Sequence, residues 1–310
     1  MNRDLDAARM AKKNEFYTRI EEIQEEMACY PGQFTGKSVY CNCDDFRFSN
    51  FVQYFLSNFR SLGLKALYSS GLSIDSDSAY RAYFEQDMSG SVQVCSACDG
   101  DFLSPANQEW LRKADIIVTN PPFSLFRAYV ANLMANQKKF LIIGNINAVT
   151  YRDIFPLIQS NQIWLGASIH SGDRPFYIPD DYPQTAAGIG MDEAGRRYVR
   201  VKGVRWFTNL DHGVRHQPLV LTKKYRPDLY QKYDRYDALN VDRTADIPAD
   251  YLGIMGVPIT FLDKYCPEQF EILGDSRYHD GNPQADDINF IHGKLTYRRL
   301  LIRRICQGGD

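Results

Sequence analysis

The sequence lacks the features that mark membrane-spanning, secreted and disordered chains. Nowhere in its 310 residues does an apolar run approach the roughly 18 residues that a membrane-spanning helix needs. The first six residues carry charge where a signal peptide has its apolar core, so we expect a cytoplasmic protein with no membrane partner. Aromatic residues make up 13% and apolar residues 44%, and disorder requires much lower hydrophobicity. The chain should therefore fold, as one large domain or two moderate ones.

A strong charge of one sign is also missing, because the net charge is only −2. That average hides blocks in the second half. Residues 196–226 hold nine basic residues and one acid, residues 227–287 hold five and thirteen, and residues 294–304 hold five and none. Any nucleic-acid surface is therefore expected to be local, with the acidic segment facing away from it.

Seven cysteines are an odd number for a set of disulfides, and a cytosolic chain keeps its thiols reduced. Cys41 and Cys43, with Cys95 and Cys98, could offer four thiolates to zinc. A C-x-C pair followed some fifty residues later by C-x₂-C is not a common zinc spacing. Cys41 also alternates within an apolar run, as a small buried side chain does. We therefore predict no metal site.

Strand and helix patterns alternate through the first 166 residues. Such alternation is typical of an α/β fold with a mostly parallel central sheet and helices on both faces. After about residue 170 the pattern becomes β-rich and irregular, which predicts a division into 1–170 and 171–310. Strands are expected over 38–43, 64–68, 91–95, 114–119, 139–144 and 162–166, helices over 20–30, 48–62, 105–113, 124–137 and 150–160, and later β segments over 198–201, 204–207, 219–222, 270–273 and 295–305.

The tetrapeptide Asn120-Pro121-Pro122-Phe123 directly follows a buried strand and precedes an amphipathic helix. The two prolines stiffen the loop, and the Asn120 side chain and the Pro121 carbonyl offer two hydrogen-bond acceptors. With the aromatic face of Phe123 they suit a planar amino group. An ordinary strand-to-helix turn with a core phenylalanine is the alternative. The position favours function, because ligands of α/β sheets bind at the carboxyl ends of strands.

This tetrapeptide resembles the catalytic motif of amino-group methyltransferases that use S-adenosylmethionine. Five segments, in the same order, are similar to the EcoRI-type adenine-specific (N6) DNA methyltransferase family. They are Lys13–Thr18, Val39–Asp45, Ala114–Arg127, Lys139–Asn145 and Trp206–Asp211.

The resemblance implies a Rossmann-like class I methyltransferase fold. Residues 1–170 would form the cofactor-binding and catalytic core, and residues 171–310 the last core strands and a DNA target-recognition region. The cofactor would be S-adenosyl-L-methionine, with double-stranded DNA as substrate. The enzyme would act either with a restriction endonuclease that cuts the same site, as a further partner, or as a solitary methylase. Cofactor-binding residues would be Phe16, Tyr17, Thr18, Asn42, Cys43, Asp44, Asp101, Phe102 and Asn120.

Several of these positions have structural alternatives. Phe16 and Tyr17 could be an aromatic staple before the first helix, Asp44 or Asp45 could cap the helix that follows, and Asp101 could lie in a surface turn. The turn at Asn42 also departs from the usual glycine-rich methyltransferase pattern, although the EcoRI-type proteins share the glycine-free version.

The implied reaction is methyl transfer to N6 of a flipped-out adenine, with Asn120, Pro121, Pro122 and Phe123 as the catalytic set. In the basic segment, phosphate contacts are expected from Arg196, Arg197, Arg200, Lys202 and Arg205, with a solvated β face as the alternative. Two other functions stay open. One is a methyltransferase acting on an RNA base or a protein glutamine, and the other is a non-catalytic DNA-binding protein with a relict fold.

Overall fold

A computed structural model describes residues 18–72, 78–85, 90–96, 100–170, 172–178, 188–276 and 288–305. Two compact units are present. The first comprises residues up to Asp153 together with Leu165–Asp211, and the second comprises Ile154–Trp164 and the chain from His212 onward. The sequence assigns catalysis to residues 1–170 and DNA recognition to residues 171–310. These functional assignments stay predictions.

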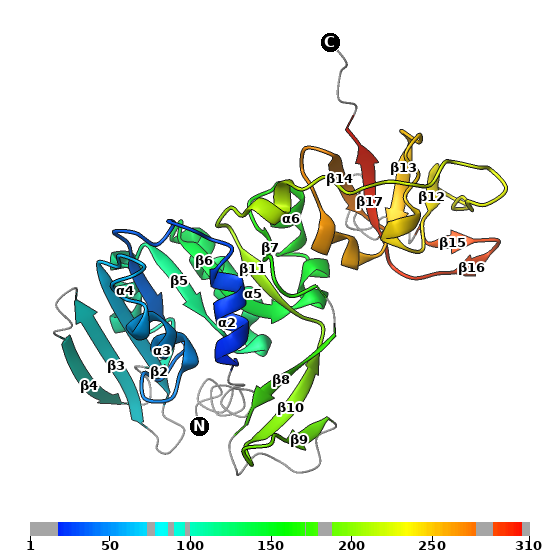
Figure 1. Cartoon of the computed structure of the whole chain (residues 1–310). Coiled ribbons are helices and arrows are strands. Elements are labelled where there is room, and N and C mark those ends of the chain that lie inside the picture. Colours follow the sequence, from blue (N-terminus) through cyan, green and yellow to red (C-terminus); the bar gives the residue numbers. More distant parts are fainter. Residues whose placement is uncertain are drawn as a thin grey trace. The chain divides into compact units, whose positions relative to one another are not determined.

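The first unit is built on an eight-stranded sheet with the order β4-β3-β2-β1-β5-β6-β11-β7 (Figure 1). The pairs β1–β2, β1–β5 and β5–β6 are parallel, which confirms the predicted parallel centre. The hairpin β3–β4 and strand β11 are antiparallel to their neighbours. The strands are β1 (Ser38–Cys41), β2 (Ala66–Leu72), β3 (Ser78–Glu85), β4 (Gly90–Ser96), β5 (Ile116–Thr119), β6 (Lys139–Asn145), β7 (Trp164–Leu165) and β11 (Val204–Thr208).

Helices cover both faces of this sheet, as the alternation predicts. Alternate strand residues carry apolar side chains to opposite faces, so one face packs against α2 and α3. The other face packs against α5, where the rings of Phe126 and Phe207 lie 5.0 Å apart. The helices of this unit are α2 (Ile20–Met27), α3 (Asn50–Ser57), α4 (Pro105–Lys113), α5 (Phe126–Ala135), and the short 3₁₀ helices η2 (Phe123–Leu125) and η3 (Ile146–Thr150).

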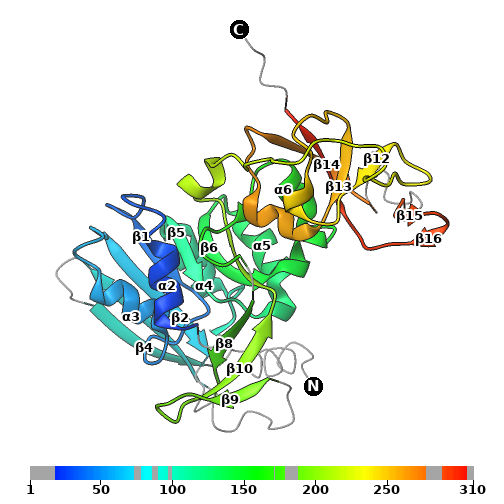
Figure 2. The same ribbon diagram turned by 45° about the vertical axis from the view of Figure 1, so that its right-hand side comes forward.

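A three-stranded antiparallel sheet, in the order β8-β10-β9, lies outside the main sheet in both ribbon views (Figures 1 and 2). Its strands are β8 (Asp173–Tyr177), β9 (Ile189–Met191) and β10 (Arg197–Lys202). Its inner face joins the main core, because Phe176 and Val201 pack against the cluster that also holds the α2 and α3 side chains.

The second unit has its own four-stranded sheet, β12-β13-β17-β14, and a separate hairpin, β15–β16. Its elements are α6 (Phe155–Gln159), η4 (Gly213–His216), β12 (Ala238–Asn240), η5 (Thr244–Asp246), β13 (Ile254–Val257), η6 (Ile259–Lys264), β14 (Phe270–Asp275), β15 (Phe290–Ile291), β16 (Lys294–Leu295) and β17 (Leu300–Arg304). No helix in the described ranges is long and apolar enough to cross a bilayer.

Four expectations about secondary structure are wrong. The β segment expected over 295–305 is interrupted, because β16 ends at Leu295 and β17 begins only at Leu300. The helix expected over 150–160 is the 3₁₀ turn η3 followed by the five-residue α6, since Pro156 can lie only in a first helical turn. Residues 219–222 form no strand, and Val220 is 84% exposed, so no apolar face is buried there. The helix expected over 48–62 ends at Ser57. By contrast, α4 begins as predicted, with Ser104 as its N-cap and Pro105 in its first turn.

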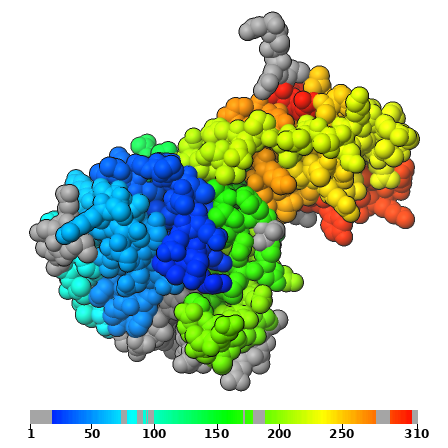
Figure 3. Space-filling model, in the orientation of Figure 1, coloured from blue at the N-terminus to red at the C-terminus, as the bar shows by residue number. Residues whose placement is uncertain are grey.

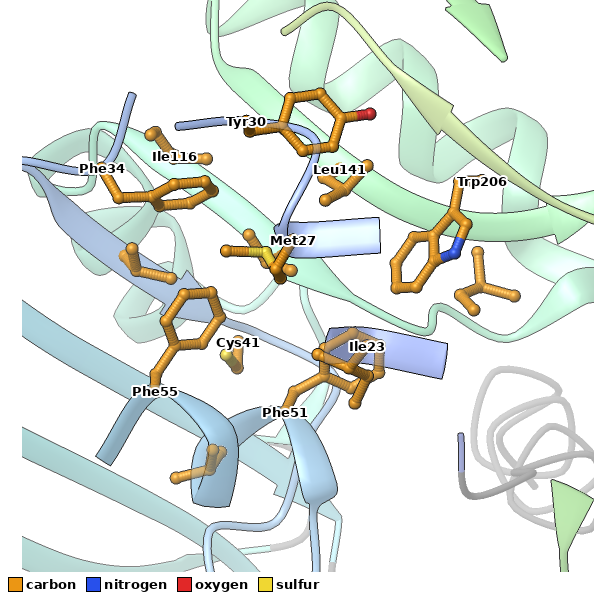
Figure 4. Close-up of a cluster of buried hydrophobic side chains, with 14 of the residues drawn as sticks. Ile23, Met27, Tyr30, Phe34, Cys41, Phe51, Phe55, Ile116, Leu141 and Trp206 are labelled. Carbon is orange, nitrogen blue, oxygen red and sulfur yellow. The ribbon is translucent and has the colours of Figure 1, made fainter. Parts of the chain in front are cut away.

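Helix α2, in dark blue, is visible at the surface of its unit (Figure 3). It packs its apolar side into the core and exposes Glu21 and Glu25. Figure 4 shows the cluster beneath it, in which α2, α3 and the sheet all take part. The labelled side chains are Ile23, Met27, Tyr30, Phe34, Cys41, Phe51, Phe55, Ile116, Leu141 and Trp206.

Two carboxylates of α2, those of Glu22 and Glu26, are buried. The Glu26 side chain is fully buried, and its Oε1 accepts hydrogen bonds from the Tyr30 hydroxyl (2.7 Å) and the Ala167 N–H (2.8 Å). Its Oε2 accepts from the Ser168 N–H (2.7 Å) and hydroxyl (2.6 Å). Four donors compensate for the burial of the charge, so Glu26 ties α2 to the segment that follows β7.

Replacing Glu26 by Gln should lower the free energy of unfolding by about 2–4 kcal/mol, because an amide NH₂ would then face N–H and O–H donors in a buried site. Urea unfolding followed by circular dichroism measures this. The matched control is Glu25→Gln, one position earlier and exposed, which should change stability by less than about 0.5 kcal/mol. Equal effects of the two substitutions would contradict the role given to Glu26.

Candidate active site

Strands β1 and β5 lie side by side where the winding of the sheet reverses. From β1 the chain adds β2 on one side, and later β5 on the other. The register Val39–Ile116 and Tyr40–Ile117 brings the carboxyl ends of both strands to the same edge. Asn42 follows the first end and Asn120 follows the second. This reversal point is where open parallel sheets bind their ligands.

The buried side chain of Asp44 joins these strand ends. Its Oδ2 accepts a hydrogen bond from the Thr119 hydroxyl at the end of β5, and its Oδ1 accepts from the Ser49 hydroxyl at 2.6 Å. Its backbone N–H donates to the Ser70 carbonyl (2.9 Å), and its own carbonyl accepts from the Ser69 hydroxyl (2.6 Å), both on β2. One residue therefore connects β1, β2, β5 and the start of α3.

Burial raises the pKa of Asp44 to about 6, because the charged form loses its hydration. The hydroxyls of Ser49 and Thr119 oppose this rise, since both donate to the ionised carboxylate. Each carboxylate oxygen of Asp44 thus accepts one hydrogen bond within the protein and has a second lone pair, and the expectation that Asp44 contacts a ligand stays a prediction.

Asp45 and the helix cap also differ from the sequence-based alternatives. The carboxylate of Asp45 accepts from the Arg47 guanidinium, with an Nη2–Oδ2 distance of 2.6 Å. Neither Asp44 nor Asp45 caps α3. Ser49 is the N-cap, and its hydroxyl oxygen accepts from the N–H groups of Phe51 and Val52.

Asn42 is fully buried directly after β1, and its Oδ1 accepts a hydrogen bond from the Tyr129 hydroxyl of α5. Its Nδ2 is buried too, and no atom of the described residues accepts from it. The ring of Tyr129 packs edge-on against Phe102, with the centroids 5.0 Å apart. Tyr129 thus connects two of the residues expected to bind the cofactor. Cys43, between Asn42 and Asp44, is half-buried.

Asp101 lies in an exposed turn, and its Oδ1 accepts from the Leu103 N–H at 2.9 Å. This matches the surface-turn alternative for its local structure, and it leaves the carboxylate at the surface. Phe102 is only 5% exposed. Its predicted contact with a ligand therefore concerns an edge of the ring or the backbone.

Of the N-terminal motif, Phe16 and Tyr17 lie outside the described residues. Thr18 is buried, and its carbonyl accepts from the Asn50 side chain at 2.7 Å. Because Asn50 follows the Ser49 cap, Thr18 lies beside the part of α3 that contacts Asp44. Its hydroxyl oxygen is buried and has no hydrogen-bond partner among the described residues.

The Asn120-Pro121-Pro122-Phe123 loop leaves β5 directly. The Pro122 carbonyl accepts from the Leu125 N–H at 2.9 Å, which starts the helical turn η2. Asn120 and Phe123 are half-buried, and Phe123 packs against the main apolar cluster. The loop therefore has the form of the strand-to-helix turn, held against the core at both ends. Asn120 as a residue is half-buried, and its Oδ1 atom is buried.

The predicted phosphate-binding residues fall on the β8–β10–β9 sheet. Arg200 and Lys202 are exposed and alternate with inward-facing valines. The Arg196 guanidinium lies 4.2 Å from the Tyr177 ring centroid, and that of Arg200 lies 5.5 Å from the Tyr198 centroid. Tyr177 and Tyr198 are register partners, so both rings belong to one basic and aromatic face.

Two members of the predicted set are not on this face. Arg197 is half-buried on the alternate side of β10. Arg205 is buried at 3% exposure on β11, and its guanidinium donates to the carbonyls of Val204 (2.8 Å) and His170 (2.6 Å). Arg205 is thus a structural residue, because its apolar strand neighbours carry it into the core.

Four residues of the site were not found from the sequence. Ser49, Thr119 and Tyr129 donate hydrogen bonds that orient Asp44 and Asn42. Gly71 on β2 lacks a side chain, which lets the backbone of Asp44 and Asp45 approach that strand closely. Ser49 had a usable signal, a serine just before an amphipathic helix. For Thr119 and Tyr129, nothing in the sequence says which buried group they will meet. In the described part of the chain no cluster of three or more His, Cys, Asp or Glu side chains could hold a metal ion.

Comparisons with known proteins show the family to which the chain belongs. A family profile described as "Adenine-specific methyltransferase EcoRI" matches residues 4–304. The chain is 43% identical to the Type II methyltransferase M.EcoRI of Escherichia coli, over 97% of this chain and 96% of that protein. It is 37% identical to M.MpnI of Mycoplasma pneumoniae and 35% identical to M.MgeORF184P of Mycoplasma genitalium, in each case over 96% of this chain and 97% of the relative. No solved structure gives a significant match. Nearly the whole chain matches, and it belongs to the EcoRI-type family of adenine-specific methyltransferases.

Proposed function

We propose that the chain binds S-adenosyl-L-methionine at the ends of β1 and β5 and methylates N6 of an adenine turned out of double-stranded DNA. Its family and its relatives make it an adenine-specific DNA methyltransferase. The cofactor, the extruded base and the residue roles are our proposal. The observation that carries it is the Asn120–Phe123 loop, fixed beside the end of β1 at the reversal point of the sheet.

The groups at this edge fit the cofactor. S-adenosyl-L-methionine would supply an electrophilic methyl group together with amino, carboxylate, ribose and adenine groups to recognise. The exposed Asp101 carboxylate can accept from an amine, and the buried Asn42 Nδ2 is a donor without a partner in the described residues. The Thr18 hydroxyl is another buried polar group of this kind. Such groups are costly unless they are satisfied, and a polar ligand would satisfy them.

The loop would activate the target amine by accepting hydrogen bonds. The N6 lone pair is delocalised into the adenine ring, so this nitrogen is a weak nucleophile. Acceptance of its two hydrogens by the Asn120 Oδ1 and the Pro121 carbonyl favours a tetrahedral nitrogen with a localised lone pair. The same acceptors lie where positive charge develops during transfer. Phe123 would stack on the extruded base, while its packing against the core holds the ring in place.

Type II relatives also support a role in restriction-modification, with a cognate endonuclease as a further expected partner. The β8–β10–β9 face would hold the phosphate backbone through Arg196, Arg200 and Lys202. Its two tyrosines hold two of these guanidinium groups in place.

Replacing Asn120 by Ala should lower the transfer rate at least about 100-fold, because one of two acceptors at the reacting amine is removed. Transfer of labelled methyl from the cofactor to duplex DNA, followed by nucleoside analysis, measures this, and DNA affinity should stay near the wild-type value. Asn147→Ala, at an exposed position, is the matched control. Full activity of the Asn120 variant would show that another group accepts the amine hydrogens.

The acid limb of the pH–rate profile should report Asp44. Ionised Asp44 accepts from Ser49 and Thr119, so kcat should fall as pH drops through about 6. The Thr119 hydroxyl lowers this pKa, so Thr119→Val should raise it and move the acid limb to higher pH by about one unit. Thr119→Ser keeps the donor and should leave the limb in place. If the limb has the same midpoint in both variants, Asp44 does not set it.

DNA affinity should depend steeply on salt, since phosphate contacts release counterions. Arg200→Ala and Lys202→Ala should each reduce the slope of log K against log salt by about 1. Arg60→Ala, an exposed substitution just after α3, is the control. Arg205→Ala should instead lower the thermal stability, because it leaves two buried carbonyls without donors. An unchanged slope in both the Arg200 and the Lys202 variants would remove this face from the DNA interface.

A further inference from the structure

The hairpin β15–β16 and the segment just after it present large exposed side chains on a firmly held backbone. Leu295, at the end of β16, is 61% exposed, and Tyr297, two residues beyond that strand, is 81% exposed. His292 and Lys294 are exposed at the tip of the hairpin. The hairpin stands out from the rest of its unit in both ribbon views (Figures 1 and 2). Its red-orange atoms lie at the rim of that unit in the space-filling view (Figure 3). Exposed apolar and aromatic side chains that cluster on one surface segment are a mark of interaction sites.

The tip of the hairpin is fixed by a carboxylate. His292 and Gly293 both have positive φ values, of 50° and 72°, as a tight two-residue turn requires. The N–H groups of these two residues donate to Asp234 Oδ1 (2.9 Å) and Oδ2 (2.7 Å). These backbone bonds lower the pKa of Asp234, so its charge is held by the turn.

The base of the hairpin is fixed as well. Arg298 pairs with Asp275 at 2.5 Å, and Arg299 pairs with Asp242 at 2.8 Å. On the strand before the turn, the Asn289 carbonyl accepts from the Thr296 N–H (2.7 Å) and hydroxyl (2.9 Å). The acids named here are thus engaged within the protein, and Asp237 pairs with Lys232 at 2.7 Å.

The exposed side chains of the described hairpin are basic, aromatic and apolar. Residues 288–305 contain five Lys and Arg and no acid. Arg298, Arg299 and Arg303 pair with acids and Arg304 donates to the Ala249 carbonyl, which leaves Lys294 as the exposed cation of the hairpin. The exposed Arg235 places its guanidinium 4.9 Å from the ring centroid of Phe290, next to Leu295 across the strand pair. Lys294, Arg235 and Tyr297 can donate hydrogen bonds, and Leu295 offers an apolar tip.

We propose that this hairpin enters the major groove of DNA and reads base edges, with Lys294 and Tyr297 as sequence-determining residues. The inference rests on the proposed DNA substrate. The major groove admits a two-stranded β-ribbon, Lys donates to guanine O6 and N7, and apolar side chains contact the thymine methyl group. A rigid backbone favours this role, because it holds the hydrogen-bond donors at fixed positions. Less conformational entropy is then lost when the hairpin binds DNA.

The test selects bound sequences from random DNA duplexes with the full-length wild type, K294A and Y297A, and then measures affinity for the selected site and for single-base variants of it. Each substitution should reduce discrimination at one or two base positions about tenfold, while affinity for unrelated DNA stays within about twofold. Lys264→Ala and Val220→Ala are matched controls, since both positions are exposed in the same unit. Thermal melting confirms that each variant is folded.

A motif that persists at every position in both variants would overturn the proposal. So would an equal loss of affinity for all sequences, since that is the signature of phosphate contact. Failure of the proposed function would give a different result. The wild type would then still select a DNA motif, but it would transfer no methyl group to it.

Discussion

The buried carboxylate of Asp44 is the constraint on which the active site depends. It accepts from the end of β5 and from the cap of α3, and its backbone bonds to β2. The loops that carry Asn42 and Asn120 therefore have one relative position. An ionised carboxylate in this place is tolerable only because two hydroxyls donate to it. Loss of either hydroxyl leaves the carboxylate with a single side-chain donor, and loss of the Thr119 hydroxyl also removes its bond to the end of β5.

This connection explains how the first turn manages without glycines. Methyltransferase folds usually place Gly-x-Gly after the first strand, so that backbone can approach closely. Here the small residue lies on the neighbouring strand. A Cβ atom on Gly71 would lie 2.5 Å from the Asp45 nitrogen and 2.6 Å from the Asp44 carbonyl carbon. Because Gly71 of β2 leaves room for the backbone of the turn, the turn itself can have residues with side chains, namely Asn42, Cys43 and Asp44.

Periodicity and loop chemistry predicted the parallel centre of the sheet, the helices on both faces and the position of Asn120. These features are local, since each follows from a few adjacent residues. The inward direction of Asp44 could not be read in this way, because its partners Ser49 and Thr119 come from different elements. The burial of Arg205 has the same cause, since only the sheet order shows that β11 lies between β6 and β7.

The charge pattern illustrates the same limit. Residues 196–226 look strongly basic, yet much of that charge is used within the protein. Arg205 donates to carbonyls, Arg215 lies 3.9 Å from the Trp164 ring centroid, and Arg226 pairs with Asp228 at 2.6 Å. A count along the chain therefore overstates the charge that a phosphate backbone would meet. Arg200 and Lys202, at alternating positions on β10, keep theirs at the surface beside two tyrosines, so a chain with a net charge of −2 can still present a narrow basic strip. Its strength depends on side-chain alternation in one strand, and no average over composition reports that.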